Sequence, residues 1–183
     1  MSSFEQTPEQ IHSRKMRPAC DNVYRRLFGK DIKIKRFEKE SERFILDKEF
    51  AIDVILEMPT GIQLTGQEKA LRNYYYKYKT FTIELYNNRN SYPVGKMEAK
   101  EKGEWFNISA QFYLSGYSNI YGDGFVEWVF MDMLKFVKWI NSTFTLEQLK
   151  KKSMPSSSNA SFIPFEYSKI PKECFYARSI LNQ

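Results

Sequence analysis

The sequence predicts a protein of the α/β or α+β class, with a central mixed β-sheet flanked by helices. Apolar residues recur at helical spacing over residues 18–28, which predicts an amphipathic helix. Apolar and polar residues alternate over residues 50–69 and 80–86, as they do in half-buried strands. Residues 125–133 form a longer apolar run that suits a largely buried strand. Helices and antiparallel strands therefore follow one another along the chain.

The N-terminal elements have recognisable ends. Gly29 is a natural stop for the helix over residues 18–28, and Thr7 with Pro8 resembles a second helix start. Residues 31–46 alternate loosely, so they predict one or two strands.

The C-terminal half is predicted from the same patterns. We expect a helix over residues 103–117, because apolar side chains recur there at helical spacing. Residues 134–140 extend the strand before them and are compatible with a helix. TLEQLKKK is expected to form a short basic helix in which Thr145 and Gln148 make a capping box.

A length of 183 residues suits one main domain with a sizeable core. We expect residues 1–140 to form this core domain, including the N-terminal helix. Residues 141–183 would add the basic helix, a Ser-rich linker and an aromatic tail that packs on the core. With 42% hydrophobic and 16% aromatic residues, the composition excludes a disordered chain.

The net charge and the lack of long apolar segments limit where we expect the protein and what we expect it to bind. No segment approaches the roughly 18 uninterrupted apolar residues of a membrane span, and residues 1–18 lack a signal-peptide core. We therefore expect a cytoplasmic protein, in a microbial or viral host cytosol, without a membrane partner. Cys20 and Cys174 could pair, but buried free thiols suit a reducing compartment better. The net charge of +6 favours an anionic partner, above all nucleic acid, although many basic proteins bind none.

Residues 50–69 predict a β-hairpin with a defined register. A three-residue loop at 59–61, with Gly61 in the left-handed position, makes the numbers of paired residues sum to 120. Asp53 then lies opposite Gln67, and Lys69 lies two residues further along the same face. The other face of the hairpin is apolar.

An acid on one strand, a tight turn and an acid–x–Lys pattern on the next strand resemble the core of the PD-(D/E)xK nuclease superfamily. This group includes many restriction endonucleases and Holliday-junction resolvases, and the resemblance covers about residues 17–132. It implies a restriction-endonuclease-like core, made of a helix, a three-stranded meander, a helix and a strand. It also implies hydrolysis of DNA phosphodiester bonds with Mg²⁺ or Mn²⁺.

The resemblance assigns roles to residues of the hairpin. Asp53 and Gln67 would hold the metal, together with the carbonyl of Glu68, and Lys69 would serve the attacking water or the phosphate. Gln67 departs from the pattern, because an amide brings no negative charge to the ion. Glu68 would take its place only if Gly66 introduced a bulge and shifted the register. The alternatives are a solvated hairpin face, or a non-catalytic module on the same fold that binds nucleic acid or protein.

Other side chains are candidates for the same site or for DNA contact. The possible additional acids are Asp21, Asp47 and Glu84, and Asp21 is equally suited to pair with Arg25 four residues on. The segment RNYYYKYK mixes basic and aromatic residues, as nucleic-acid surfaces do, although at least two of its four tyrosines are expected in the core. The predicted nucleic-acid contacts are Arg25, Arg26, Arg72, Lys77, Lys79 and Gln111. Many members of the superfamily act as dimers, so a homodimer is a further expectation.

Overall fold

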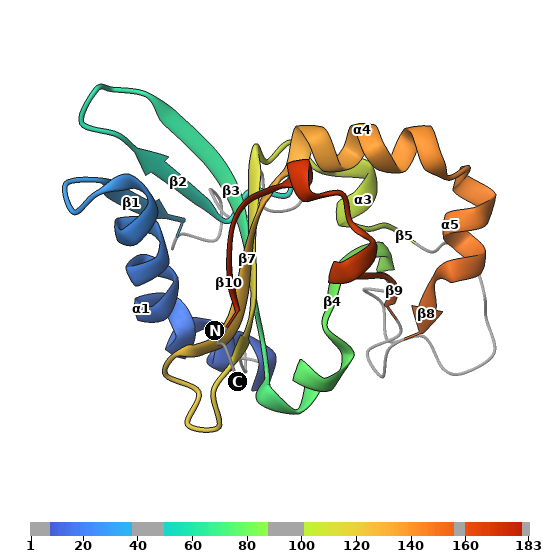
Figure 1. Ribbon diagram of the computed structural model, residues 1–183, viewed down its shortest axis with the longest axis horizontal. Coiled ribbons are helices and arrows are strands. Elements are labelled where there is room, and N and C mark those ends of the chain that lie inside the picture. Colours follow the sequence, from blue (N-terminus) through green and yellow to red (C-terminus); the bar gives the residue numbers. More distant parts are fainter. Residues whose placement is uncertain (1–7, 38–49, 88–100, 156–159, 181–183) are drawn as a thin grey trace, which may run out of the picture.

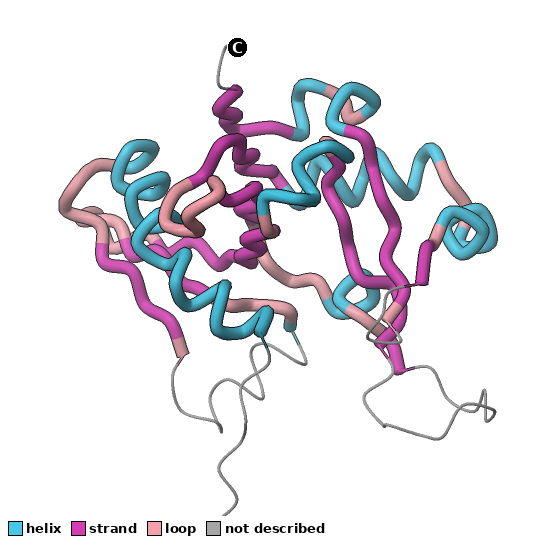
Figure 2. Tube along the Cα trace, turned by 90° about the horizontal axis from the view of Figure 1, so that it is seen from below, coloured by secondary structure: helices cyan, strands magenta, loops and turns pink. Residues whose placement is uncertain are grey.

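The computed structural model describes residues 8–37, 50–87, 101–155 and 160–180. These residues form three layers, with a six-stranded sheet in the middle (Figure 1). Helix α1 (Pro8–Phe28) covers one face, and a four-stranded sheet with helix α4 (Met133–Thr143) lies on the other (Figure 2). The predicted mixed class, with a central mixed sheet flanked by helices, is confirmed.

The six-stranded sheet is mixed. Its strands, in spatial order, are β1 (Lys33–Arg36), β2 (Val54–Glu57), β3 (Gln63–Leu71), β6 (Phe112–Ser118), β7 (Phe125–Asp132) and β10 (Phe175–Ile180). The first three form an antiparallel meander, and β6 then runs parallel to β3. Strands β7 and β10 complete the sheet in antiparallel pairs.

The connection from β3 to β6 builds part of the second layer. It contains the 3₁₀-helix η1 (Asn73–Tyr78), strand β4 (Thr80–Asn87), strand β5 (Glu101–Lys102) and the short helix α3 (Glu104–Asn107). Strand β4 pairs with β5 and with β9 (Ser161–Glu166), and β8 (Met154–Pro155) lies at the edge. Helix α5 (Leu146–Lys152) and the 3₁₀-helices η2 (Tyr167–Lys169) and η3 (Lys172–Cys174) complete this side.

Two hydrophobic cores hold the layers together. One lies between α1 and the six-stranded sheet and includes Tyr24, Phe112 and Phe130, whose rings pack against one another. The other lies between the two sheets and includes Phe81 and Tyr113. Because both faces of the central sheet are covered, its inner strands are buried on both sides.

Helix α1 begins at Pro8 as predicted, but it continues without a break to Phe28, so the prediction of a separate helix from residue 18 is wrong. Pro18 lies inside it, where it removes a backbone donor and disfavours the helix. Met16 and Cys20, on either side of Pro18, are both buried on the sheet, and this packing opposes the cost. Gly29 ends the helix as predicted, with φ of 97° and its N–H donating to the Arg25 carbonyl at 3.0 Å.

The predicted helix over residues 103–117 is wrong in most of its length. Only α3 is helical, and Phe112–Ser118 is the central strand β6. Every residue of β6 is buried, so its sequence lacks the polar alternation that marks a half-buried strand. Its apolar spacing therefore fits a buried strand and a helix equally well.

The remaining predicted elements agree with the structure. Strands over residues 80–86 and 125–133 are confirmed as β4 and β7, and residues 134–140 are helical in α4. Thr145 and Gln148 form the predicted capping box of α5. Cys20 and Cys174 are buried free thiols, as expected for a reducing compartment. Among the described residues, no helix has the length and apolar character needed to cross a membrane.

Gly66 permits the closest contact in the central sheet. A Cβ at this position would overlap the ring of Phe112 on the neighbouring strand. We expect Gly66→Ala to lower the free energy of unfolding by about 1–3 kcal/mol, because Phe112 is buried and cannot move aside. Urea unfolding measures this loss.

A matched glycine and a double variant serve as controls. At Gly124 a Cβ would meet only the Asn119 side chain, at 3.3 Å, so Gly124→Ala should change stability by less than about 0.5 kcal/mol. Adding Phe112→Leu to Gly66→Ala should recover part of the loss. Purely additive effects would show that the ring does not limit residue 66.

Candidate functional site

The β2–β3 hairpin has the register that the sequence predicts. Paired residues run from Glu57 with Gln63 to Val54 with Gly66, without a register shift. Gly66 therefore introduces no bulge. The Glu68 side chain stays on the face opposite to that of Gln67 and Lys69. The Asp53 N–H donates to the Gly66 carbonyl at 2.8 Å, which places Asp53 beside Gln67 where the ladder ends.

Asp53 lies where β2 begins and the chain bends into the sheet. Ala51, two residues earlier, has φ of 51°, an uncommon conformation for a residue other than glycine. The Asp53 Oδ2 atom accepts the N–H of Glu68 at 3.1 Å and so replaces a strand partner. In a strand the N–H and C=O of one residue point to the same side, so the Glu68 carbonyl also faces Asp53. A carboxylate offers about four lone-pair sites, so this bond does not exhaust it.

Gln67 is not on a solvated face. Its side chain is 3% exposed, and its neighbour on β6 is the buried Tyr113. The alternative of an ordinary solvated hairpin face is therefore wrong at this position. An amide oxygen in such a sheltered place is able to ligate a cation.

Lys69 lies on the same face as Gln67, between the two sheets. Its Nζ atom is 4.5 Å from the centre of the Phe162 ring on β9. The face of an aromatic ring attracts an ammonium group and shields it from water. At about 3.3 Å of rise per residue, the Cα atoms of Gln67 and Lys69 are about 6.6 Å apart along β3.

A further acid approaches this face from the second layer. Glu104, on α3, accepts the N–H of Glu84 at 3.3 Å and the hydroxyl of Tyr113 at 3.4 Å. Gly103 allows this approach, because a Cβ there would lie 2.8 Å from the Glu84 carbonyl oxygen. Burial raises the pKa of Tyr113, and the charges of Glu104, Asp53 and Glu84 raise it further. The Glu104 carboxylate therefore lies 3.4 Å from the Tyr113 hydroxyl, on the face that carries Gln67.

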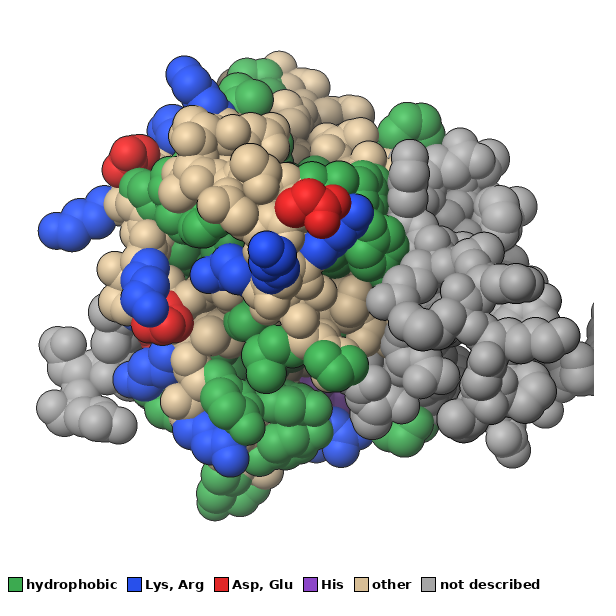
Figure 3. Space-filling view, turned by 90° about the vertical axis from the view of Figure 1, so that its right-hand side faces the viewer, with side chains coloured by type: hydrophobic (Ala, Val, Ile, Leu, Met, Phe, Trp, Pro, Cys, Tyr) green, Lys and Arg blue, Asp and Glu red, His purple; other side chains and the backbone are tan. Residues whose placement is uncertain are grey.

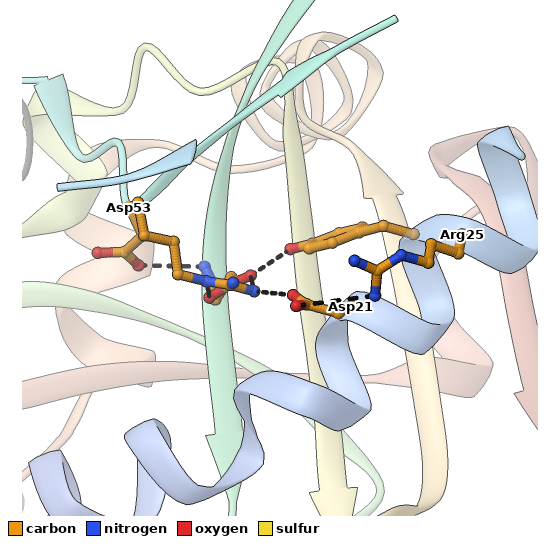
Figure 4. Close-up of polar contacts among 6 residues, drawn as sticks. Asp21, Arg25 and Asp53 are labelled. Atoms are coloured by element: carbon orange, nitrogen blue, oxygen red, sulfur yellow. Dashed lines mark hydrogen bonds and ion pairs between the residues drawn. The ribbon is translucent and has the colours of Figure 1, made fainter. Parts of the chain in front are cut away.

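The opposite face of β3 carries an ionic network. Arg36 on β1 binds the Glu68 carboxylate through Nε at 3.0 Å and Nη2 at 2.7 Å. The same Nη2 binds Asp21 on α1 at 2.6 Å, and the Tyr24 hydroxyl donates to Glu68 at 2.8 Å. Figure 4 shows Asp53 at one end of this set of contacts and Asp21 and Arg25, on α1, at the other. The Glu68 peptide thus joins the network to Asp53.

Burial and charge act in opposite directions on this network. Burial lowers the pKa of Arg36, but the hydrogen bonds and charges of Glu68 and Asp21 outweigh it and raise that pKa. Burial also raises the pKa of Tyr24, and the charge of Glu68 adds to the effect. Arg36 therefore stays charged and Tyr24 stays protonated, as their contacts require.

The other predicted site residues are dispersed. Asp21 pairs with Arg36 on the α1 face and does not join Asp53 and Gln67, and it also lies 3.9 Å from Arg25. Asp47 lies outside the described residues. The Gln111 side chain accepts the N–H of Thr65 at 2.9 Å and so extends the ladder of β3. The remaining predicted phosphate contacts are Arg25 and Arg26 on α1, and Arg72, Lys77 and Lys79 around η1.

Sequence reasoning missed three residues of this region. Arg36 reads as one more basic residue in a loosely alternating strand, and nothing around it indicates the network. Glu104 and Tyr113 both fall within residues 103–117, which the sequence predicts as a helix. Once residues 112–118 are assigned to a strand parallel to β3, Tyr113 falls next to Gln67.

The donors present fit a magnesium site with few protein ligands. Among the residues that the structure describes, no group of three or more His, Cys, Asp or Glu side chains is placed to hold a metal ion. The oxygen donors that this face offers are the Asp53 carboxylate, the Gln67 amide oxygen and the Glu68 carbonyl. Mg²⁺ commonly uses one or two carboxylates and completes its shell with water and phosphate oxygens.

Comparison with protein-family models, curated proteins and solved structures found no match to this chain. The geometry of the β2–β3 hairpin and its surroundings is therefore the basis for the proposals below.

Breaking the Arg36 network tests its structural role. The Arg36 side chain is 12% exposed, so Arg36→Met would leave Glu68 and Asp21 without their buried partner. We expect the free energy of unfolding to fall by about 3 kcal/mol. Arg25→Met is the matched control, because Arg25 is 45% exposed and 3.9 Å from Asp21. It should change stability by less than about 1 kcal/mol, and equal losses in both variants would contradict the network.

Proposed function

We propose that this protein is a metal-dependent nuclease of the PD-(D/E)xK type that hydrolyses phosphodiester bonds in DNA. The observation that carries the proposal is the register of the hairpin, which brings Asp53 beside Gln67 with Lys69 on the same face. The element order supports it too. A helix, an antiparallel three-stranded meander and a strand parallel to the third occur in this order, as in the restriction-endonuclease-like core, but the crossover helix of that core is represented only by the four-residue helix α3 and is preceded by β4 and β5.

In this proposal the residues around position 67 hold the ion. Asp53 contributes the negative charge, and the Gln67 amide and the Glu68 carbonyl contribute neutral oxygens. Mg²⁺ or Mn²⁺, when bound, polarises the phosphate and lowers the pKa of a bound water. Glu84 and Glu104 add negative potential near Tyr113, which favours a cation on this face.

Lys69 is the cationic group of the proposed site. The Phe162 ring holds its ammonium on the face that carries Gln67. An ammonium in a partly shielded place stabilises charge that builds on a phosphate more strongly than one in water does. Lys69 would therefore stabilise the phosphate or orient the attacking water.

One observation favours a second candidate, a non-catalytic module that binds nucleic acid. Position 67 carries an amide, and the described residues hold no cluster of three metal-binding side chains. A weak metal site of this kind would leave the basic surface able to bind nucleic acid without cutting it.

A cleavage assay separates the two candidates. Purified protein is incubated with supercoiled, linear, single-stranded and branched DNA, in EDTA, Mg²⁺ or Mn²⁺. We expect metal-dependent cutting that falls by about 100-fold or more in Asp53→Asn and in Lys69→Met, because each removes a charge that acts on the reacting phosphate.

Two control variants show whether a loss of cutting is specific to the proposed site. Asp31→Asn and Lys138→Met remove exposed charges elsewhere, and they should cut like the wild type. Binding without cutting in any metal would favour the module. Cutting that survives both Asp53→Asn and Lys69→Met, or that persists in EDTA, would refute the site.

A further inference from the structure

Exposed tyrosines gather where β3 and β6 end. Tyr74, Tyr75 and Tyr78 of η1 are 59%, 40% and 57% exposed. The turn between β6 and β7 adds Ile120 and Tyr121, which are also exposed. We call these five residues the tyrosine surface. The prediction that at least two of the four tyrosines in RNYYYKYK are core is wrong, because only Tyr76 packs against the core.

The tyrosine surface is fixed to the end of the sheet. Strands β3 and β6 are parallel, so the segments that follow them emerge side by side. The Asn73 side chain donates to the Ser118 carbonyl at 3.0 Å and ties η1 to the end of β6. The Tyr76 ring packs on that of Tyr117, 5.6 Å away. Figure 1 shows both segments at the lower end of the molecule.

The three tyrosines of η1 form a cluster because η1 is a 3₁₀-helix. Side chains three residues apart eclipse in such a helix, and the Tyr75 and Tyr78 ring centres are 6.5 Å apart. Tyr74 lies against Tyr75, with 4.0 Å between ring centres. Large aromatic side chains that remain exposed together on a folded surface indicate a binding site.

Positive charge surrounds the tyrosines. Lys77 lies 5.1 Å from the Tyr78 ring centre, and Lys79 lies 5.0 Å from that of Tyr76. Arg72 directly precedes η1, and Lys15 of α1 donates to the Tyr121 carbonyl at 2.7 Å. Figure 3 shows a group of green side chains, the class that includes tyrosine, at the lower edge, with Lys and Arg side chains beside it.

The acids near this end are engaged by neighbours. Asp123 accepts the Asn119 side-chain amide at 2.7 Å, and Glu166, opposite Thr80, is paired with Lys169 at 2.6 Å. The surface therefore combines exposed rings with an excess of cations. Exposed rings and cations together are suited to bind a ligand that carries both bases and phosphates.

We propose that the tyrosine surface binds single-stranded nucleic acid, with bases stacked on Tyr74, Tyr75 and Tyr78. Lys77 and Lys79 would contact its phosphates. Duplex DNA keeps its base faces stacked inside, whereas single strands offer them to aromatic rings. The inference rests on the proposed function for its nucleic-acid partner and adds the substrate class. Arg72 is three residues beyond Lys69, which is about 10 Å along an extended chain, and Tyr74 of the tyrosine surface follows two residues later. A substrate with an unpaired segment would reach both.

Binding in EDTA tests this inference separately from cutting. Fluorescence anisotropy measures the Kd for a labelled thymidine oligonucleotide and for a duplex of the same length. We expect the wild type to prefer the single strand. The triple variant Tyr74→Ala, Tyr75→Ala, Tyr78→Ala should weaken single-strand binding by at least about 10-fold. Lys77→Gln and Lys79→Gln should each reduce the slope of log K against log salt by about 0.7.

Two controls separate stacking from other effects. Replacing the same three tyrosines by phenylalanine keeps the rings and should retain binding, provided that the hydroxyl groups are not the contacts. Tyr176→Ala removes a ring that is 65% exposed at the other end of the sheet and should bind like the wild type.

The outcomes distinguish the two proposals. Unchanged single-strand binding in the triple alanine variant would overturn the tyrosine surface even if the protein cuts DNA. A triple variant that only loses self-association would overturn it as well, and would indicate a contact between copies. Asp53→Asn should retain single-strand binding in EDTA. If tyrosine-dependent binding persists and no substrate is cut, the nuclease proposal fails and the tyrosine surface stands.

Discussion

Strand β3 is covered on both faces, and this constraint decides what each of its residues can do. Side chains along a strand alternate between faces, so Gln67 and Lys69 point to the second sheet and Glu68 points to α1. A shift of one residue would bury Lys69 under α1 and turn Glu68 to the other face. The packing of Gly66 against Phe112 and the Glu68–Arg36 ion pair both require the observed register.

The charged groups on the two faces of β3 have different partners. On the α1 face, Arg36 bridges the Glu68 and Asp21 carboxylates and Arg25 lies 3.9 Å from Asp21, and this pairing suits a structural role. On the second-layer face, the charges of Asp53, Glu84 and Glu104 act together on Tyr113, which suits the attraction of a cation. The Glu68 peptide connects the faces, because its N–H binds Asp53 while its side chain binds Arg36. The proposed site is therefore held in place by a network that takes no part in its chemistry.

Local patterns were sufficient for the hairpin and insufficient for its surroundings. The turn at Gly61 and the alternation around it fixed the register, and with it the neighbourhood of Asp53 and Gln67. That alternation did not reveal that Gln67 is sheltered, because its burial depends on packing between elements that are distant along the chain, such as β6 beside it. Strand β6 was taken for a helix because a strand buried on both faces shows no period of two. The exposure of Tyr74, Tyr75 and Tyr78 depends on the 3₁₀ turn that follows β3. The sequence does not indicate this turn, because tyrosine is also common in strands.

Metal binding at position 67 tests the proposed site most directly. Gln67→Glu places a second carboxylate beside Asp53, and without metal this sheltered charge should destabilise the protein. The proposal expects Mn²⁺ to raise the melting temperature of Gln67→Glu well above its effect on the wild type, since a ligand that binds the folded state stabilises it. Asn141→Asp, which adds an exposed carboxylate on α4, is the control and should respond to Mn²⁺ like the wild type. An equal Mn²⁺ response in Gln67→Glu, Asn141→Asp and the wild type would mean that position 67 does not face an ion.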